Sequence, residues 1–404
     1  MYSILGFLTM KVLVTSYRTA SDRIALAALR GLSLAGFSPW LGTDDPSTAS
    51  ARSRHCHGII RLHSPISSPE EHAVEVMECV RKHHFSTILP TDDYAVFSLS
   101  QAYGQCATDV PLPVPPLEGQ QRAIDKASTT ELAAALGLNV PETQTVKNKS
   151  DLRHALKHIL SPWIIKLVQG GGSVGMLISD DPNEVLDHVD SLPDYADHIY
   201  DFKTLVVQSY IPGWSEDAYA LMYRGQVVRS MASRRLLSWP DQNGSGILSE
   251  TISKPSFFEK SVELLEALGW HGPANIEFRI DQRSGQSYFI EVNGRLWGTT
   301  AMAIAAGVNF PALSCQMAIE DGLRKELSFP AGVRMRFPFP LGLHHLAASS
   351  SKLSVGWQLF GPSMRCKSEF WWSDPIPGLL QLRDGIKRVR SGQSARALSP
   401  LSIN

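Results

Sequence analysis

Two segments in which apolar and polar residues alternate, 274–281 and 287–293, stand on either side of the turn sequence Gln-Arg-Ser-Gly at 282–285. Alternation with a period of two is typical of β-strands, and the short polar turn predicts that the two strands form an antiparallel hairpin. If the chain turns about the middle of the polar segment, Glu277 lies directly opposite Glu291 on one face. The pattern therefore predicts a piece of antiparallel sheet and the register of its strands.

Two carboxylates placed opposite each other repel unless a cation lies between them. Asn293 lies two residues further along the face of Glu291, and Phe289 is expected on that face as well. Two carboxylates and an amide oxygen suit Mg²⁺ that is held jointly with phosphate oxygens. The alternative is a surface hairpin whose acids are solvated, which a shift of one residue in register would produce.

Residues 11 to about 110 alternate short apolar segments with helical patterns. Strands are expected at 12–14, 37–41 and 86–89, and helices at 24–35 and 69–83. This order predicts a parallel sheet with helices on its faces, and ligands bind beyond the carboxyl ends of such strands. Thr15-Ser16 and Thr91-Asp92-Asp93 stand at two such ends, where they either contribute to a site or serve as turn and helix-cap residues.

The segment 163–178 contains glycines at 170, 172 and 175, which formally match G-x-G-x-x-G. A dinucleotide-binding loop of this kind opens a helix, whereas Met176-Leu-Ile continues as a strand, and Met176 also stands where a P-loop requires its lysine. The segment therefore predicts two strands joined by a glycine-rich turn that can fold over phosphates. Lys166, on the incoming strand, is either a phosphate ligand or a surface residue whose charged end reaches solvent.

The composition narrows the classes of function. The chain has 404 residues, and 38 Lys and Arg against 39 Asp and Glu give a net charge of −1. This balance offers no electrostatic basis for binding nucleic acid or an acidic membrane, and no apolar run is long enough to span a bilayer. Five cysteines without a C-x-x-C pair favour a reducing, cytoplasmic location, and His55-Cys56-His57 is a weak candidate for a metal site. Met10 is a candidate for the true start, since 11–14 already forms a strand.

Taken in their order along the chain, these segments resemble the ATP-grasp superfamily over residues 11–320. The motifs that support the resemblance are Asp125-Lys126, Ile165-Lys166 with the glycine loop, Val207-Gln-Ser-Tyr-Ile-Pro-Gly213, Glu277-Phe-Arg and Glu291-Val-Asn-Gly-Arg295. The last of these is close to the family's E-x-N-x-R and is the most specific. The chain is most similar to the carboxylate–amine ligase branch, near the carbamoyl-phosphate-synthase-like proteins.

The resemblance implies an α/β (α+β) fold of the ATP-grasp type. An N-terminal parallel-sheet pre-ATP domain is expected at 10–115 and ends in the Pro-rich segment 111–116, which is interpreted as a linker. The first part of the ATP-grasp unit, with a small lid subdomain that contains the glycine loop, is expected at 116–206. A larger antiparallel-sheet subdomain with the acidic hairpin follows at 207–320, and 321–404 is a C-terminal extension.

The resemblance also implies roles for single residues. Glu277, Glu291 and Asn293 would hold Mg²⁺, with Mn²⁺ as a substitute. Arg295 would stabilise an acyl phosphate as it forms, while Arg234 or Arg235 would bind a substrate carboxylate unless the pair is only a solvated strand end. The residues that would contact the phosphates, adenine and ribose of ATP are Lys126, Lys166, Gly171, Gly172, Ser173, Val174, Gln208, Ser209, Tyr210, Ile211, and Glu216 or Asp217.

The implied function is that of an ATP-dependent ligase, which activates a carboxylate as an acyl phosphate and joins it to an amine with release of ADP and phosphate. Its substrates would be small and amino-acid-like, and neither nucleic acid nor a membrane is expected as a partner. A homodimer is a further expectation. Two alternatives stay open. One is a non-catalytic nucleotide-binding sensor, against which the intact set of Lys, Glu and Asn argues. The other is a dinucleotide-dependent oxidoreductase, against which the strand after Gly175 argues.

Overall fold

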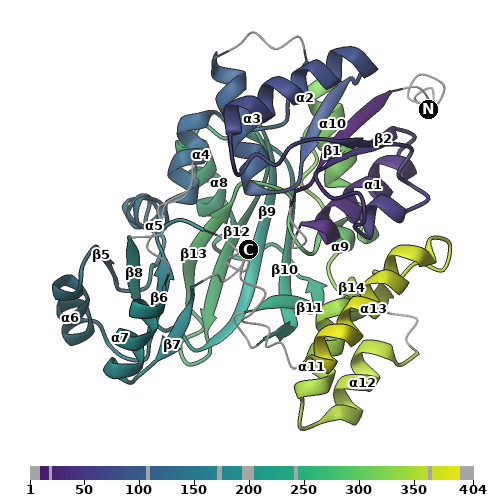
Figure 1. The fold of residues 1–404 in the computed structure, drawn as a ribbon. Helices are drawn as coiled ribbons and strands as arrows, with labels where there is room; N and C mark the ends of the chain where they lie inside the picture. The colour runs from purple at the N-terminus through teal and green to yellow at the C-terminus, as the bar shows by residue number, and fades with distance from the viewer. Residues whose placement is uncertain are drawn as a thin grey trace.

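The computed structural model of the chain describes residues 10–17, 21–105, 110–170, 175–192, 204–240, 244–362 and 366–391. Within these residues the chain forms a four-stranded parallel sheet, a four-stranded antiparallel sheet and a seven-stranded sheet (Figure 1). The mixed α/β fold that the sequence predicts is therefore confirmed.

The N-terminal part is a parallel sheet with strand order β3-β2-β1-β4. Helix α2 begins at the predicted residue because the Ser68 side chain accepts the N–H of Glu71 and Pro69 occupies the first turn. Strand β3 is a three-residue edge strand and was not predicted, since so short a segment has no detectable period. The elements are β1 (Lys11–Thr15), α1 (Asp22–Leu34), β2 (Ser38–Thr43), the 3₁₀ turn η1 (Ser50–Arg52), β3 (Ile59–Arg61), α2 (Pro69–His83), β4 (Thr87–Pro90) and α3 (Asp93–Gln105).

The Pro-rich segment 111–116, interpreted from its composition as a linker, is packed against the N-terminal sheet. Leu112 and Val114 are buried in the core of the N-terminal sheet, and Thr87 Oγ1 donates to the Pro111 carbonyl at 2.6 Å. The residues between the prolines are apolar, so the extended chain buries one of its sides. The segment leads directly into α4 (Leu117–Ile124) and α5 (Lys126–Ala135).

The second sheet has the order β5-β8-β6-β7 and contains both strands that flank the glycine loop. Because β6 and β7 pair antiparallel, the two strands predicted on either side of the glycines are confirmed. Strand β8 lies inside this sheet, so the lid extends past the boundary predicted at residue 206. The elements are β5 (Thr143–Val146), α6 (Lys149–His158), β6 (Trp163–Leu167), β7 (Leu177–Ser179), α7 (Pro182–Ser191) and β8 (Leu205–Ser209).

The large sheet has the order β13-β12-β9-β10-β11-β14-β15. One face packs against α8, and the other packs against α9 and α10, which lie between this sheet and α1 of the N-terminal part. The elements are β9 (Gly213–Tyr223), β10 (Gln226–Trp239), β11 (Ser245–Thr251), α8 (Phe258–Ala267), β12 (Gly272–Asp281), β13 (Ser287–Asn293), α9 (Thr300–Ala305) and α10 (Phe310–Ile319).

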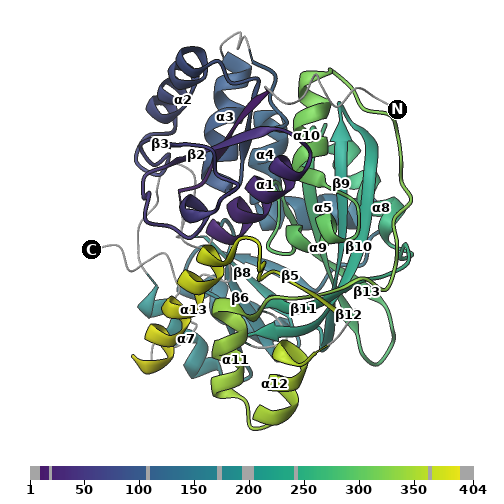
Figure 2. The same cartoon turned by 90° about the vertical axis from the view of Figure 1, so that its right-hand side faces the viewer.

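The C-terminal extension adds two strands to the large sheet, since β14 pairs with β11 and β15 pairs with β14. Its helices lie together on one side of the molecule (Figure 2). None of the helices in the described ranges combines the length and the apolar content needed to cross a membrane. The elements are β14 (Arg334–Arg336), the irregular turn η2 (Pro338–Gly342), α11 (Leu343–Ala348), α12 (Lys352–Phe360), β15 (Cys366–Ser368) and α13 (Pro375–Arg390).

Two arginines of α1 hold the extension against the N-terminal part. Arg30 Nε donates to Asp374 Oδ2 at 2.9 Å, and both side chains are buried. Ser53 Oγ donates to the same carboxylate oxygen at 2.7 Å. Arg23 Nε lies 3.3 Å from Glu369 Oε1. Because each buried acid has a basic partner, these contacts fix the extension without leaving an uncompensated charge.

The N-terminal core contains a buried histidine whose tautomer follows from its neighbours. Ser98 Oγ donates to the Pro69 carbonyl at 2.6 Å, so it accepts the proton of His72 Nδ1 at 2.7 Å. The Tyr17 hydroxyl then donates to His72 Nε2 at 2.7 Å. Burial lowers the pKa of His72 to about 3, which keeps the ring neutral in the folded state.

We expect this histidine to make the stability depend on pH. Its pKa in the folded state lies below its unfolded value of about 6.5, so its contribution is complete above pH 6.5 and declines as the pH falls. Between pH 6.5 and pH 5 the loss amounts to about 2 kcal/mol. Urea unfolding at both pH values measures it. His72→Gln, which keeps one donor and one acceptor, should remove about this much of the difference, and an unchanged difference would contradict the assignment.

Candidate functional site

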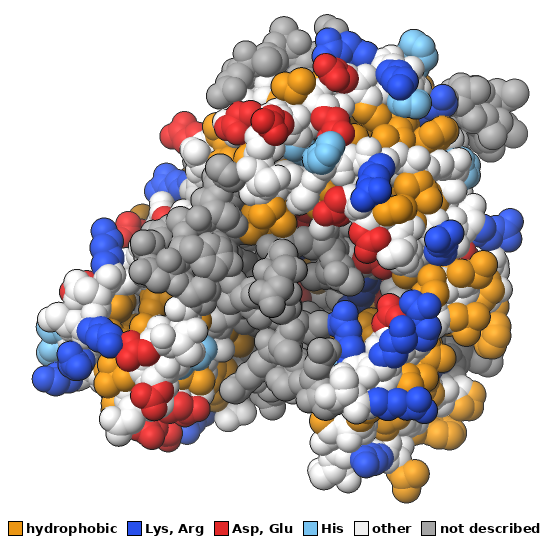
Figure 3. Space-filling view, in the orientation of Figure 1, with side chains coloured by type: hydrophobic (Ala, Val, Ile, Leu, Met, Phe, Trp, Pro, Cys, Tyr) orange, Lys and Arg blue, Asp and Glu red, His pale blue; other side chains and the backbone are white. Residues whose placement is uncertain are grey.

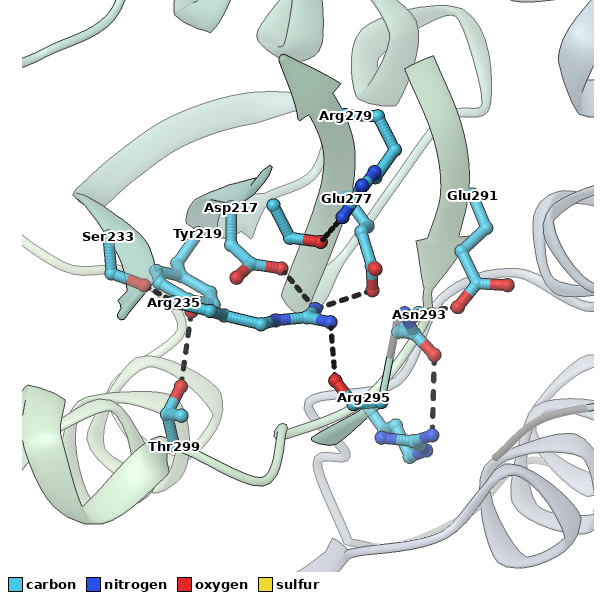
Figure 4. A network of polar contacts seen from close by, with 12 residues as sticks. Asp217, Tyr219, Ser233, Arg235, Glu277, Arg279, Glu291, Asn293, Arg295 and Thr299 are labelled. Atoms are coloured by element: carbon cyan, nitrogen blue, oxygen red, sulfur yellow. Dashed lines mark hydrogen bonds and ion pairs between the residues drawn. The ribbon is translucent and has the colours of Figure 1, made fainter. Parts of the chain in front are cut away.

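Three carboxylates lie in one row across neighbouring strands of the large sheet (Figure 4). Glu277 on β12 pairs with Asp217 on β9 and with Glu291 on β13. Asn293 lies further along β13, opposite Asn275. The register predicted for the hairpin at Glu277 and Glu291 is therefore confirmed. Below, Asp217, Glu277, Glu291 and Asn293 are called the acidic row.

A β-bulge beside the acidic row moves one residue away from its predicted face. Phe278 pairs with Phe289, so Ile290 is the extra residue of β13. Phe289 is buried with Phe278 in the core under α8, and its prediction on the face of Glu291 is wrong. A strict period of two does not anticipate a bulge, which here lets the carboxylate face the site while the rest of the strand packs.

Arg235 on β10 lies between two of the carboxylates. Its Nη2 donates to Asp217 Oδ1 at 2.9 Å and to Glu277 Oε2 at 2.6 Å. Burial acts to lower the pKa of Arg235, but the two carboxylates outweigh it and raise this pKa well above its ordinary value. Burial raises the pKa of Glu277, as do the carboxylates of Asp217 and Glu291, and Arg235 offsets part of that rise. Arg235 therefore neutralises one end of the row.

Two lysines neutralise the other end. Lys126, the first residue of α5, places its Nζ 3.9 Å from Glu291 Oε2 and donates to the Gly170 carbonyl at 2.5 Å. Lys166 points away from the lid core, because its neighbours on β6 point into that core. Burial lowers the pKa of Lys166, which Glu291 opposes. Burial acts to raise the pKa of Glu291, but Lys126 and Lys166 outweigh it and lower this pKa below its ordinary value.

Arg295 connects the end of β13 with the N-terminal sheet. Its Nε donates to Asp93 Oδ2 at 2.9 Å, and its Nη2 donates to Asn293 Oδ1 at 3.3 Å. Asn293 Nδ2 in turn donates to Glu291 Oε1 at 3.2 Å. A continuous series of polar contacts thus runs from the N-terminal part to the acidic row.

The strand-end segment Thr91-Asp92-Asp93 divides between the two roles considered for it. Asp92 Oδ1 accepts the N–H of Ala95 at 2.9 Å, which is a helix-cap contact. Asp93, the next residue, contacts Arg295 and so belongs to the site. Its place at the carboxyl end of β4 was the only signal in the sequence, because its partner is 202 residues away.

These parts enclose a small pocket in the described structure. Its lining combines the first residue of α5, the residue at which β6 leads into the glycine loop, and the end of β13. The lining residues are Asp93, Ala123, Ile124, Lys126, Gly170, Glu291, Val292 and Asn293. A larger hollow near Tyr223 and Lys325 contains none of the residues predicted for the site.

Arg234 and Glu216 lie on the other side of the large sheet. Successive residues of a strand face opposite ways. Because Arg235 and Asp217 belong to the acidic row, Arg234 and Glu216, which pair with each other in register, face away from it. Glu216 Oε1 accepts from Trp214 Nε1 at 2.9 Å. The structure thus separates the two arginines that were predicted to act as a pair, and it does not bring Glu216 to the site.

The segment predicted to bind adenine follows β8 and is already partly hydrogen-bonded. Gln208 is buried, and its amide donates to a hydroxyl of β5 at 3.0 Å. The N–H groups of Ser209 and Tyr210 donate to neighbouring carbonyls, and the Ile211 carbonyl accepts from Arg279 at 3.3 Å. The Ser209 N–H is therefore already paired, whereas the Ile211 carbonyl has two lone pairs and can accept a further hydrogen bond. Outside the described residues lie the four loop residues predicted to contact phosphates, Gly171, Gly172, Ser173 and Val174.

The acidic row fits a hard cation that also has oxygen ligands from another molecule. Glu277, Glu291 and Asn293 offer two carboxylates and an amide oxygen, whereas Asp217 is paired with Arg235. Within the described ranges, no group of three or more His, Cys, Asp or Glu side chains is arranged to hold a metal by itself. Mg²⁺ keeps several water or phosphate ligands in proteins, so this donor set matches it.

Solved structures of other proteins share this fold. The biotin carboxylase domain of 2-oxoglutarate carboxylase from Hydrogenobacter thermophilus, in complex with MgADP and bicarbonate, has a TM-score of 0.65 at 16% identity and covers 80% of this chain and 73% of its own. The L-amino acid ligase from Bacillus licheniformis has a TM-score of 0.60 at 18% identity and covers 78% of this chain and 75% of its own. At these identities the likeness establishes the fold alone.

Among proteins similar in sequence, the carbamoyl phosphate synthase large chain of Thermomicrobium roseum is 26% identical over 215 residues, which is 50% of this chain and 19% of that protein. The chain thus spans about a fifth of this relative's length. A model of the family described as carbamoyl-phosphate synthase L chain, ATP binding domain, matches residues 125–326. This match covers half of the chain, and the chain belongs to that ATP-grasp family.

Proposed function

We propose that this chain binds Mg-ATP and uses it to join a carboxylate to an amine. The observation that supports this most directly is the acidic row facing Lys126 and Lys166 beside the strand that enters the glycine loop. A metal bound to a triphosphate presents a cation and anionic oxygens together, and a pocket with acids on one wall and lysines on the other complements both. Membership of an ATP-binding family supports the nucleotide.

In this proposal the triphosphate lies between the lysines and the acidic row. Glu277, Glu291 and Asn293 would hold Mg²⁺, which would neutralise charge on the phosphate oxygens. The glycine loop, whose flanking strands β6 and β7 the structure describes, would cover the phosphates and exclude water. Adenine lies near the segment Gln208–Ile211. Asp217 accepts a hydrogen bond from Arg235, which also contacts Glu277, and in this proposal it does not contact ribose.

The proposed reaction has two steps. A carboxylate oxygen of the substrate attacks the γ-phosphorus of ATP, which breaks the bond to ADP and forms an acyl phosphate. The amine then attacks the acyl carbon, which breaks the bond to phosphate, and the amine proton passes to solvent or phosphate. Arg295 stabilises the negative charge of the acyl phosphate, and Arg235 keeps Glu277 in place. Positioning and charge stabilisation thus supply most of the catalysis.

The similar structures named above support this reaction class. One is a carboxylase domain solved with MgADP and bicarbonate, and another is an amino acid ligase. Their substrates are properties of those proteins. The first shares with the proposal a Mg-nucleotide together with bicarbonate, and the second shares the ligation of amino acids that its name states.

A nucleotide-binding sensor without turnover is the second candidate. Three features that a sensor does not need argue against it: two opposed carboxylates, two lysines that compensate one of them, and an arginine held by Asp93. The oxidoreductase alternative has no support in the structure, because β7 and not a helix follows the glycine loop.

The proposed function is tested by ADP release from the chain supplied with ATP, Mg²⁺ and pooled amino acids, with the products identified by mass. We expect ADP release to depend on an acid in the pool, and a product whose mass equals acid plus amine minus water. Tight binding of ATP without ADP release on any acid would favour the sensor. A control without Mg²⁺ should show no turnover.

We expect Asp93→Asn to lower kcat about tenfold with a smaller change in the KM for ATP, because the variant loosens Arg295 without removing a phosphate ligand. Steady-state kinetics measures both constants. In an Arg295→Met background the same substitution should add no further loss. The matched control is Asp321→Asn, which removes an exposed arginine partner far from the pocket. Independent losses in the double variant would contradict a role through Arg295.

A further inference from the structure

The larger part of the C-terminal extension, residues 332–404, has a net positive charge that the rest of the chain lacks. Residues 332–404 contain ten Lys and Arg against three Asp and Glu, whereas residues 1–331 contain 28 against 36. Two of the three acids, Glu369 and Asp374, are buried against Arg23 and Arg30. The third, Asp384, is paired with an adjacent arginine. The near-neutral net charge of the whole chain thus conceals a region whose exposed charge is positive.

Helix α12 in this extension presents an apolar stripe to solvent. Leu353, Trp357 and Phe360 follow the i, i+4, i+7 spacing of one helix face and are 93%, 67% and 43% exposed. The opposite face of the helix is already buried through Val355 and Leu359. Folding of the described residues therefore leaves this stripe uncovered.

The stripe continues through aromatic rings toward α13. The ring centroids of Phe360 and Phe339 are 5.8 Å apart, those of Phe339 and Phe370 are 6.3 Å apart, and those of Phe370 and Trp372 are 5.1 Å apart. Trp372 is 88% exposed. A series of ring contacts thus links the exposed apolar residues of α12 with Trp372, and we call these exposed residues together the aromatic face.

Helix α13, which follows Trp372 in the chain, carries positive charge on its exposed side. Its outer side begins with the exposed Ile376 and Leu379 and continues with the exposed Arg383, Lys387 and Arg390. Figures 2 and 3 show that the C-terminal helices lie together on one side, where hydrophobic side chains alternate with Lys and Arg.

We propose that the aromatic face and the basic side of α13 bind a membrane surface that contains anionic phospholipid. Tryptophan, phenylalanine and leucine beside lysine and arginine suit the boundary between acyl chains and phosphate headgroups. A second copy of the chain is a poorer occupant, since a symmetric contact would place like charges together. The net charge of the whole chain offers no basis for membrane binding, whereas the charge of residues 332–404 does.

Flotation of the full chain with vesicles tests the proposal. Vesicles of phosphatidylcholine with a third of phosphatidylserine should bind the chain, pure phosphatidylcholine should bind at least about tenfold less, and salt should weaken the binding. Trp357→Ser with Leu353→Ser should lower the partition coefficient about tenfold. Lys387→Glu with Arg390→Glu should lower it by a similar factor of about ten. Leu160→Ser, which changes another exposed leucine outside the extension, is the matched control.

Any outcome other than those expected overturns the proposal. Equal binding to both vesicle types would show that charge has no role, and equal binding by variants and control would show that this face has no role. No binding at all excludes a lipid surface. If the chain forms dimers in solution that Trp357→Ser dissociates, and vesicles do not compete with them, the occupant is a second copy. Thermal unfolding of every variant shows whether a loss of binding reflects misfolding.

Discussion

Glu291→Gln should lower turnover about 10³-fold or more while the fold stays intact. The substitution keeps an oxygen that can accept from Asn293 but removes the charge that Lys126 and Lys166 compensate. Loss of one preorganised charge at a reacting phosphoryl group typically costs factors of about 10² to 10³, and loss of a metal ligand adds to this. The measurement is ADP release at saturating ATP, together with a Mg²⁺ titration, in which the apparent affinity for Mg²⁺ should fall.

The matched control for this variant is Glu250→Gln. Glu250 lies on β11 of the same sheet and also has a basic partner, with Arg334 Nε at 3.0 Å, but it pairs with Arg234 and so faces away from the acidic row. The Glu250→Gln variant should leave turnover nearly unchanged. A wild-type rate in Glu291→Gln would exclude the Mg²⁺ assignment, and equal losses in both variants would indicate a general effect on the sheet.

Arg235→Met should destabilise the fold by about 3–5 kcal/mol, because it leaves Asp217 and Glu277 as buried carboxylates without a partner. Mg²⁺ at millimolar concentration should restore part of this loss. A cation bound by Glu277 offsets the uncompensated charge in the variant, whereas the wild type already has Arg235 there. Thermal unfolding with and without Mg²⁺ measures both effects.

Arg224→Met is the matched control for the stability measurement. Arg224 Nη2 also contacts a carboxylate, Asp321 Oδ1 at 2.6 Å, but both side chains are mostly exposed. Exposed ion pairs contribute little, so this variant should change stability only slightly. If Mg²⁺ stabilises Arg235→Met no more than it stabilises the wild type, the cation does not bind beside Glu277.

The sequence predicted the parts of the site whose geometry follows from local patterns. Alternation and one turn were enough to place Glu277 opposite Glu291, and a strand after the glycines was enough to exclude a dinucleotide fold. Alternation alone could also have shown that Arg234 and Arg235 face opposite ways, because they are adjacent on one strand. The resemblance to a family had grouped them nevertheless.

Other features depend on tertiary contacts that no local pattern contains. The bulge at Ile290 depends on how β13 packs against α8. The contact of Asp93 with Arg295 joins two parts of the chain that fold around different sheets. The burial of the Pro-rich segment, and the two strands that the extension adds to the large sheet, also required the assembled structure.

The hydrogen bond from Lys126 to the Gly170 carbonyl has a thermodynamic consequence. One ammonium group is shared between the base of the glycine loop and Glu291. An incoming phosphate would compete with the Gly170 carbonyl for that group, so nucleotide binding and the Lys126–Gly170 hydrogen bond are linked in free energy. By reciprocity, the factor by which this hydrogen bond weakens nucleotide affinity is the factor by which the nucleotide weakens the hydrogen bond. A single side chain can thus couple occupancy of the pocket to the position of Gly170.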